Sequence, residues 1–69
     1  MLLTLAETGT TYIIKKINGT SDIRQHLESL GFVVGASISI INSSEGDLVV
    51  NIKESRIAIN REMAANILL

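Results

Sequence analysis

A helix that stops at one glycine, followed by a strand that starts after a second glycine, is the feature that most constrains this fold. Both glycines lie in residues 27–35, at Gly31 and Gly35. Gly31 ends a run with the i, i+4, i+7 apolar spacing of one face of an α-helix. The apolar residues of this run are Ile23, Leu27 and Leu30. Glycine at this point takes the left-handed conformation that ends many helices, with Phe32 packing back on the last turn. We therefore predict a helix over about residues 22–30 that ends in a Schellman motif.

The start of this helix carries polar residues that can cap it. Ser21 and Asp22 stand where a side-chain oxygen accepts hydrogen bonds from the free backbone N–H groups of a first helical turn. Gln25, three residues after Asp22, is placed to complete a capping box. We therefore expect the N-cap at Ser21 or Asp22.

The length and composition of the chain predict one small domain with an aliphatic core. Residues 1–69 form a single domain that buries only about 60–65% of its unfolded surface. Apolar residues make up 46% of the chain, although it has one Phe, one Tyr and no Trp. Because this proportion is high for so small a domain, we expect an apolar surface at a docking face or a subunit contact. The absence of Cys fits a reducing, cytoplasmic setting.

The charge and hydropathy patterns exclude several classes of partner. The net charge is −1 and the Lys and Arg residues are spread over the chain, so no basic surface for nucleic acid is predicted. The apolar runs are far shorter than the roughly 18 residues of a membrane span. The first residues lack the basic leader and the long apolar core of a signal peptide. We therefore expect a cytoplasmic protein that does not insert into a membrane.

Four further segments have the β-branched residues and the period-two alternation of strands. They cover residues 11–17, 37–42, 47–53 and 56–60. The polar residues 43–46 link the second of these strands to the third, and Glu54-Ser55 is short enough for a tight hairpin before the fourth. Residues 61–67 are rich in helix formers and predict a short C-terminal helical turn.

An antiparallel meander is the natural arrangement of these strands. A closed barrel removes the sheet edges that an open four-stranded sheet would expose to other chains. We therefore predict a mainly β fold, a small SH3-like antiparallel barrel with one inserted α-helix over about residues 22–30 and a short C-terminal helical turn.

The pattern of glycine, aliphatic and charged positions resembles the FeoA family over nearly the whole chain. The residues that carry this resemblance are Gly9, Ile14, Ile17, Gly19, Arg24, Leu27, Leu30, Gly31, Phe32, Gly35, Ile40, Gly46, Asp47, Val50, Ile57, Ile59 and Arg61. The most specific part is residues 27–35. This chain has Val34 where the family commonly has Pro, and residues 43–48 replace an Ala-Pro-Leu-Gly-Asp-Pro-like loop.

The resemblance implies a fold and a function. FeoA proteins are small cytoplasmic SH3-like proteins associated with FeoB, a ferrous-iron transporter with a cytosolic GTP-binding domain. A related domain forms the C-terminal domain of the iron-dependent repressors. The resemblance therefore implies a non-catalytic accessory of ferrous-iron uptake that docks on the cytosolic part of a FeoB-type transporter.

The residues offer little chemistry for catalysis. The chain has no Cys and one His, and no serine stands in a nucleophile elbow or beside a suitable base. Gly31 and Gly35 are interpreted as turn glycines, because no Lys-Ser/Thr ending follows them and a strand, not a helix, comes next. We therefore do not expect an enzyme.

The candidate partner-binding residues lie between the predicted helix and the next strand. They are Leu30, Gly31, Phe32, Val33, Val34 and Gly35. The glycines shape this loop and the apolar residues supply contact. Phe32 is expected to seal the end of the helix while Val33 and Val34 face a partner.

A metal site is the alternative from a different class of function. Asp22 and His26 are one helical turn apart and could both reach one Fe²⁺ or another divalent transition metal. Two ligands are too few for a tight site. Further oxygens would have to come from Glu7, Glu28, Glu54 or Glu62. On this hypothesis the chain is a weakly metal-binding regulatory domain like the C-terminal domain of iron-dependent repressors, whereas on the other Asp22 and His26 are only a surface pair.

A third hypothesis is self-assembly. The aliphatic surface predicted from the composition would then be a contact between copies of the chain in a homo-oligomer.

Overall fold

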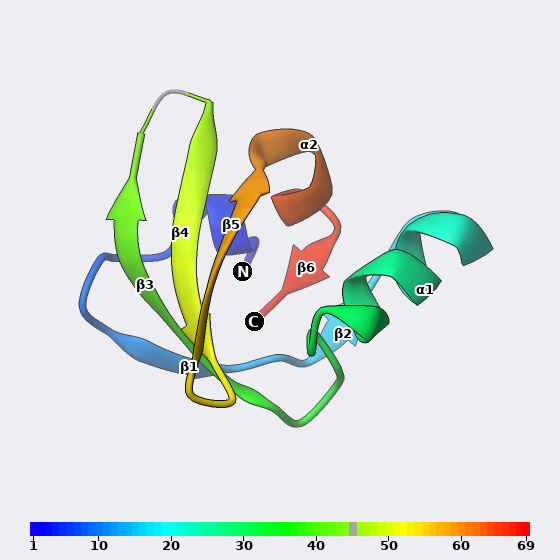
Figure 1. Ribbon diagram of the computed structural model, residues 1–69, viewed down its shortest axis with the longest axis horizontal. Helices are drawn as coiled ribbons and strands as arrows, with labels where there is room; N and C mark the ends of the chain where they lie inside the picture. The colour runs from blue at the N-terminus through cyan, green and yellow to red at the C-terminus, as the bar shows by residue number, and fades with distance from the viewer. Residues whose placement is uncertain (45) are drawn as a thin grey trace.

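The computed structural model describes residues 1–44 and 46–69, so Glu45 of the predicted polar turn lies outside the described residues. Figure 1 shows the arrangement of the elements. In chain order they are the 3-10 helix η1 (Leu3–Leu5), β1 (Thr11–Ile13), β2 (Lys16–Ile17), α1 (Ser21–Ser29), β3 (Ser37–Ser43), β4 (Asp47–Ile52), β5 (Ser55–Asn60), α2 (Arg61–Ala64) and β6 (Ile67–Leu68).

The main sheet is antiparallel and has the strand order β1-β3-β4-β5. β3, β4 and β5 follow one another as the predicted meander. The register between β3 and β4 shifts between Ile40 and Asn42, whereas β4 and β5 pair without a shift from Asp47 to Ile52. The register shift is a β-bulge, which bends β3 and increases the twist of the sheet. The prediction of a mainly β fold with one inserted helix is therefore confirmed.

The prediction of one continuous strand over residues 11–17 is wrong. β1 pairs with β3 and ends at Ile13, whereas β2 pairs with β6 in a separate two-stranded sheet. The change of partner occurs around Ile14, which is completely buried. The next backbone N–H, that of Lys15, donates to the carbonyl oxygen of Leu68 over 2.8 Å. The chain bends here because the side chain of Ile14 turns into the core and the backbone then follows a new neighbour.

The tight hairpin between β4 and β5 is present but lies one residue earlier than predicted. Its two loop residues are Lys53 and Glu54, with φ values of 49° and 66°, and Ile52 pairs with Ser55. Two successive left-handed residues match the twist of a two-residue hairpin. β4 therefore ends before Lys53 and β5 begins at Ser55.

The predicted C-terminal helical turn is present as α2 and is shorter than residues 61–67. The side-chain oxygen of Asn60 caps it by accepting the backbone N–H of Met63 over 2.8 Å. β6 follows α2. The first and last residues of the chain lie side by side next to it, because the N–H of Leu69 donates to the carbonyl oxygen of Met1 over 2.7 Å. Leu2 also forms an isolated bridge with Leu68.

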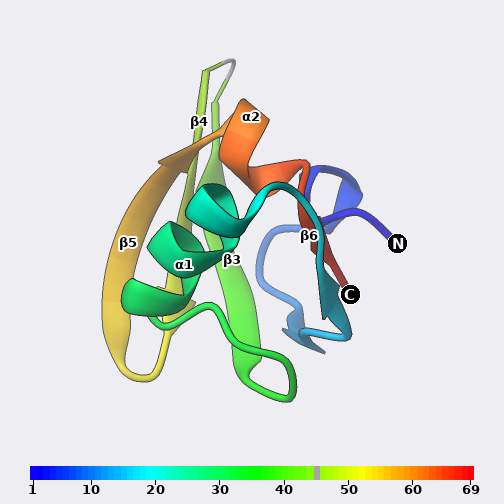
Figure 2. The ribbon, with the colours of Figure 1, turned by 90° about the vertical axis from the view of Figure 1, so that its right-hand side faces the viewer.

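The core is aliphatic, as the composition predicts, with Phe32 as its one aromatic member among the described residues. The buried residues come from η1, α1, the three long strands, the C-terminal segment and two connecting segments: Leu3, Ile14, Leu27, Phe32, Ile38, Ile40, Leu48, Val50, Ile52, Ile59, Ala64, Ile67 and Leu69. Figure 2 shows α1 lying between β5 and the segment that carries β2. α1 thus covers the side of the barrel that the main sheet leaves open.

Candidate functional site

The end of α1 has the predicted Schellman geometry. The N–H of Phe32 donates to the carbonyl oxygen of Leu27 over 3.0 Å, and that of Gly31 donates to Glu28 over 3.0 Å. Gly31 has a φ of 106°, which is accessible to glycine and strained for other residues. Leu27 and Phe32 both belong to the core. The helix end therefore fixes the direction in which the chain enters residues 32–35.

The beginning of α1 differs from the prediction by one or two residues. Thr20 is the N-cap, and its Oγ1 accepts the backbone N–H of Ile23 over 3.3 Å. Thr20 has extended backbone angles, so Ser21 already lies in the first turn and cannot be the cap. Asp22 also lies in the first turn, where its negative charge interacts favourably with the positive end of the helix dipole.

Backbone hydrogen bonds to Ile14, the residue that follows β1, hold the loop after Phe32. The N–H of Gly35 donates to the carbonyl oxygen of Ile14 over 2.8 Å, and the N–H of Ile14 donates to Ala36 over 3.0 Å. The N–H of Ala36 also donates to the carbonyl oxygen of Val33 over 3.1 Å. Val33 and Val34 are therefore presented from a turn that is fixed at both ends.

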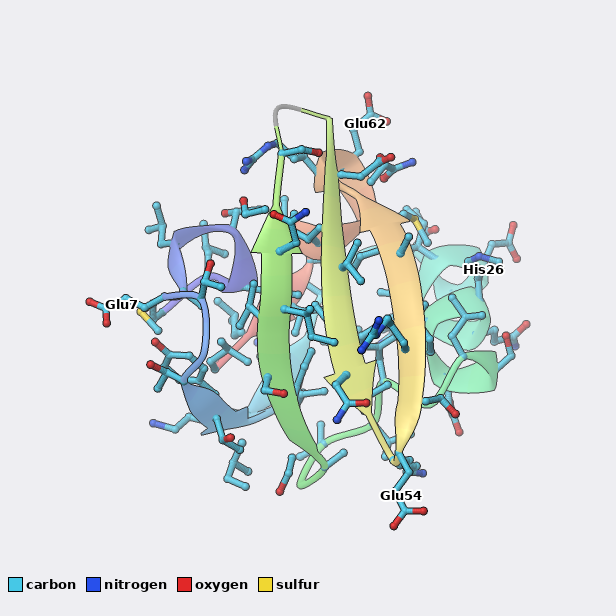
Figure 3. The ribbon with its side chains drawn as sticks, turned by 60° about the vertical axis from the view of Figure 1, so that its left-hand side comes forward. Glu7, His26, Glu54 and Glu62 are labelled. Carbon is cyan, nitrogen blue, oxygen red and sulfur yellow. The ribbon has the colours of Figure 1, made fainter. Side chains whose placement is uncertain are left out.

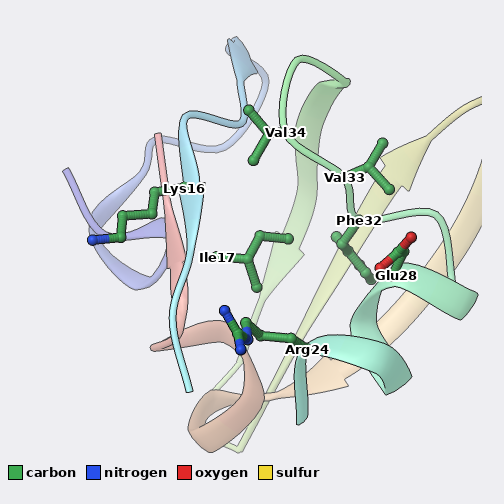
Figure 4. A pocket seen from close by; sticks show the side chains of 7 residues that line it. All are labelled: Lys16, Ile17, Arg24, Glu28, Phe32, Val33 and Val34. Atoms are coloured by element: carbon green, nitrogen blue, oxygen red, sulfur yellow. The ribbon is translucent and has the colours of Figure 1, made fainter. Parts of the chain in front are cut away.

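A groove of about 450 Å³ lies between β2, α1 and this loop (Figure 4). We call it the α1–β2 groove. The residues that line it are Lys16, Ile17, Arg24, Glu28, Phe32, Val33 and Val34. Phe32 is buried, whereas Val34 is 65% exposed. The volume is in the range of small ligand sites, and the mixture of apolar surface and charged rim is typical of a protein contact.

The structure places half of the predicted partner-binding residues in this groove. Phe32, Val33 and Val34 line it. Leu30 instead packs against the core, half-buried. Gly31 faces the other side, because a Cβ atom there would lie 3.8 Å from Lys53 Cδ. Gly35 contributes its backbone bond to Ile14 and does not line the groove.

Sequence reasoning missed the four groove residues that come from β2 and α1. Arg24 and Glu28 lie one helical turn apart and, with the period of the helix, could have been assigned to the face next to the loop. Lys16 and Ile17 could not have been assigned to the groove from the sequence, because their position depends on the bend at Ile14 and on pairing with β6.

The candidate metal ligands are not brought together. Asp22 and His26 are both exposed on α1. Figure 3 shows Glu7, Glu54 and Glu62 on different sides of the molecule from one another and from His26. In residues 1–44 and 46–69, no group of three or more His, Cys, Asp or Glu side chains is arranged to hold a metal ion. Although α1 also carries Glu28, which lines the α1–β2 groove, this residue does not form such a group with Asp22 and His26.

No helix in the described part of the chain is long and apolar enough to cross a membrane.

Comparison with known proteins identifies the family. The FeoA domain family matches residues 1–69. The chain belongs to the FeoA family. A curated protein of Methanocaldococcus jannaschii described as an Fe(2+) transport protein A is 33% identical over 67 residues, which cover 97% of this chain and 82% of that protein. FeoA proteins are non-catalytic accessories of ferrous-iron transport, and this is the function class of the chain.

Solved FeoA structures share the fold. An iron uptake regulatory protein, FeoA, superimposes with a TM-score of 0.91 at 28% identity, over 97% of this chain and 91% of that one. Stenotrophomonas maltophilia FeoA, a prokaryotic SH3 domain protein solved in complex with zinc, gives 0.84 at 20% identity, over 99% of this chain and 87% of that one. The predicted SH3-like fold is therefore confirmed.

Proposed function

We propose that this FeoA protein regulates ferrous-iron uptake by docking through the α1–β2 groove on the cytosolic part of a FeoB-type transporter. The observation that carries this proposal is the exposure of Val34. This side chain is 65% exposed at the groove. Its loop is nevertheless fixed, because backbone hydrogen bonds join the loop to Ile14, which is completely buried. Val34 lies beside the half-buried Val33 and Ile17 in the groove, and an exposed apolar patch of this kind is a contact surface for a partner.

The fixed loop also lowers the cost of binding. Association orders side chains and loops at an interface, and a surface that is already ordered loses less conformational entropy. The bonds of Gly35 to Ile14 and of Phe32 to Leu27 set the loop before a partner arrives. Val33 and Val34 therefore act as preformed contact residues, while Phe32 supports them from the core.

Regulation follows from a difference in affinity. A docked module shifts a transporter between two conformations only if it binds one of them more tightly, and the shift equals that difference. A tenfold preference for one state of the GTP-binding domain corresponds to about 1.4 kcal/mol. No catalytic group is required on the FeoA side.

An amide NMR titration tests the docking. The labelled protein is mixed anaerobically with the cytosolic domain of its cognate FeoB-type transporter, first without and then with Fe²⁺. We expect the largest shift changes without iron at Ile17, Phe32, Val33 and Val34. Shift changes confined to the opposite side of the sheet, or none at all, would contradict docking through the groove.

The same titration separates docking from the metal-binding alternative. That alternative rests on Asp22 and His26, which are exposed one turn apart on α1. It predicts shift changes around these two residues only when Fe²⁺ is added, with no response to the transporter domain. His26→Ala would abolish such changes, whereas docking does not depend on His26.

A further inference from the structure

The charged residues of the α1–β2 groove are distributed unevenly along it. Figure 4 shows the side chain of Arg24 reaching across from α1 toward Ile17, whereas the carboxylate of Glu28 lies beside Phe32. The nitrogen of Lys16 points away from the other lining residues. The α1 wall of the groove therefore presents a guanidinium and a carboxylate one helical turn apart, beside apolar residues of the groove.

Within residues 1–44 and 46–69, the charged side chains that line the groove have no partners. Arg24 and Glu28 are exposed, and in the described residues neither side chain has a hydrogen bond or an ion pair. Although residues one helical turn apart often pair, these two do not. The guanidinium of Arg24 is therefore available to a bound group, and its planar donors suit a carboxylate especially well.

From the guanidinium of Arg24 beside the apolar residues of the groove, we infer that the groove recognises a partner segment with an apolar side chain next to a carboxylate. This inference rests on the proposed docking function. The apolar side chain contacts Ile17, Val33 and Val34, and the carboxylate meets Arg24. Glu28, one turn further along α1, repels a carboxylate there, so one direction of the segment is favoured. Arg24 thus sets the direction, while the apolar residues supply contact.

The expected size of the charge effect is modest. Ion pairs at an exposed rim contribute up to about 1 kcal/mol, which corresponds to about fivefold in affinity. The effect is screened by salt, because both groups remain close to water. Charge recognition therefore changes the affinity by about threefold to fivefold at low salt, and less at high salt.

Two blocked peptides test this inference without the transporter. The probes are Ac-Ala-Leu-Ala-Leu-Glu-Ala-Ala-NH₂ and the same sequence with Gln in place of Glu, each titrated into the labelled protein at low salt. We expect both to shift the amides of Ile17, Val33 and Val34, with the acidic peptide binding about threefold to fivefold more tightly. Equal affinities, or shift changes outside the groove, would overturn the inference.

Two variants with the same change in net charge supply the control. Arg24→Gln removes the guanidinium at the groove, whereas Arg56→Gln removes the guanidinium of an exposed residue of β5 that does not line the groove. The preference for the acidic peptide should disappear in Arg24→Gln and remain in Arg56→Gln. A preference lost equally in both variants would show a response to net charge alone and would contradict the role of Arg24.

The outcomes also separate this inference from the docking proposal. Transporter docking at the groove together with equal peptide affinities would overturn the inference and leave docking intact. Peptide selectivity without transporter docking would support the inference and contradict docking. Light scattering of the free protein that shows a concentration-dependent mass lost in Arg24→Gln would assign the groove to a second copy, and would overturn the assignment to a partner.

Discussion

The two walls of the α1–β2 groove are built in different ways. One wall, α1 and its end at Phe32, is fixed mainly by hydrogen bonds between near neighbours in sequence, such as Phe32 with Leu27, and only the loop after it is tied to the distant Ile14. The other wall, β2, is held by pairing with β6, and the N–H of Lys15 just before β2 donates to the carbonyl oxygen of Leu68. β6 lies where the first and last residues of the chain meet, at the bond from Leu69 to Met1. The comparison teaches that a short motif determines the shape of the first wall, whereas the second exists only when the whole chain has folded.

The core joins the two walls. Leu27 and Phe32 from the first wall lie in the same buried cluster as Ile14 and Ile67. Ile14 precedes β2, and Ile67 of β6 pairs with Ile17 of β2. A change in the first wall can therefore remain local only if it leaves this cluster intact. The predictions that follow test where the local wall ends and the shared core begins.

The largest effect is expected for Phe32→Ala, which removes the largest completely buried side chain. Truncation of a buried Phe costs about 3–5 kcal/mol, which is comparable to the whole stability of a domain of this size. We expect most of the variant to be unfolded in urea titrations followed by circular dichroism. Val34→Ala is the control in the same loop, because an exposed side chain changes stability by less than about 0.5 kcal/mol. A cost below about 1 kcal/mol for Phe32→Ala would place Phe32 outside the shared core.

An intermediate effect is expected where the two walls meet, at Gly19. A Cβ atom there would lie 3.1 Å from Asn66 Oδ1 and 3.1 Å from Ile23 Cγ2, and φ is 106°. Gly31 has the same φ, but its nearest atoms would be 3.8 Å away. Gly31→Ala should therefore cost about 1 kcal/mol from backbone strain alone, and Gly19→Ala about 2 kcal/mol or more.

Thermal unfolding of both glycine variants measures this difference. Gly46→Ala is the control, because Gly46 does not have a left-handed φ and has open space around it. Equal losses at Gly19 and Gly31 would show that contact between the walls adds nothing to the strain. An unchanged melting temperature for Gly31→Ala would contradict the Schellman ending of α1.

The smallest effect is expected at the start of the local wall. Thr20→Ala removes the oxygen that accepts the N–H of Ile23 and should cost about 0.5–1 kcal/mol. Ser21→Ala should change the free energy of unfolding little, because Ser21 is exposed and does not cap the helix. Urea denaturation of the two variants compares them directly, and a larger loss for Ser21→Ala would return the N-cap to its predicted position.

The difference between the walls also explains which features could be predicted from the sequence. The helix end, the meander and the apolar residues Phe32, Val33 and Val34 follow from local spacing and from glycine. The bend at Ile14 and the strand β6 do not, because they arise from pairing between distant residues. Since Lys16 and Ile17 reach the groove only through that pairing, local patterns could not assign them to the site.

The most direct test of docking compares two exposed apolar residues that differ in position. Val34 is 65% exposed and lines the groove, whereas Leu5 is 69% exposed in η1 and does not line it. The affinities of Val34→Asp and Leu5→Asp for the cytosolic domain of the cognate FeoB-type transporter are measured by biolayer interferometry. We predict at least a tenfold loss, about 1.4 kcal/mol, for Val34→Asp and less than about twofold for Leu5→Asp. Equal losses, or a greater loss for Leu5→Asp, would contradict docking through the α1–β2 groove.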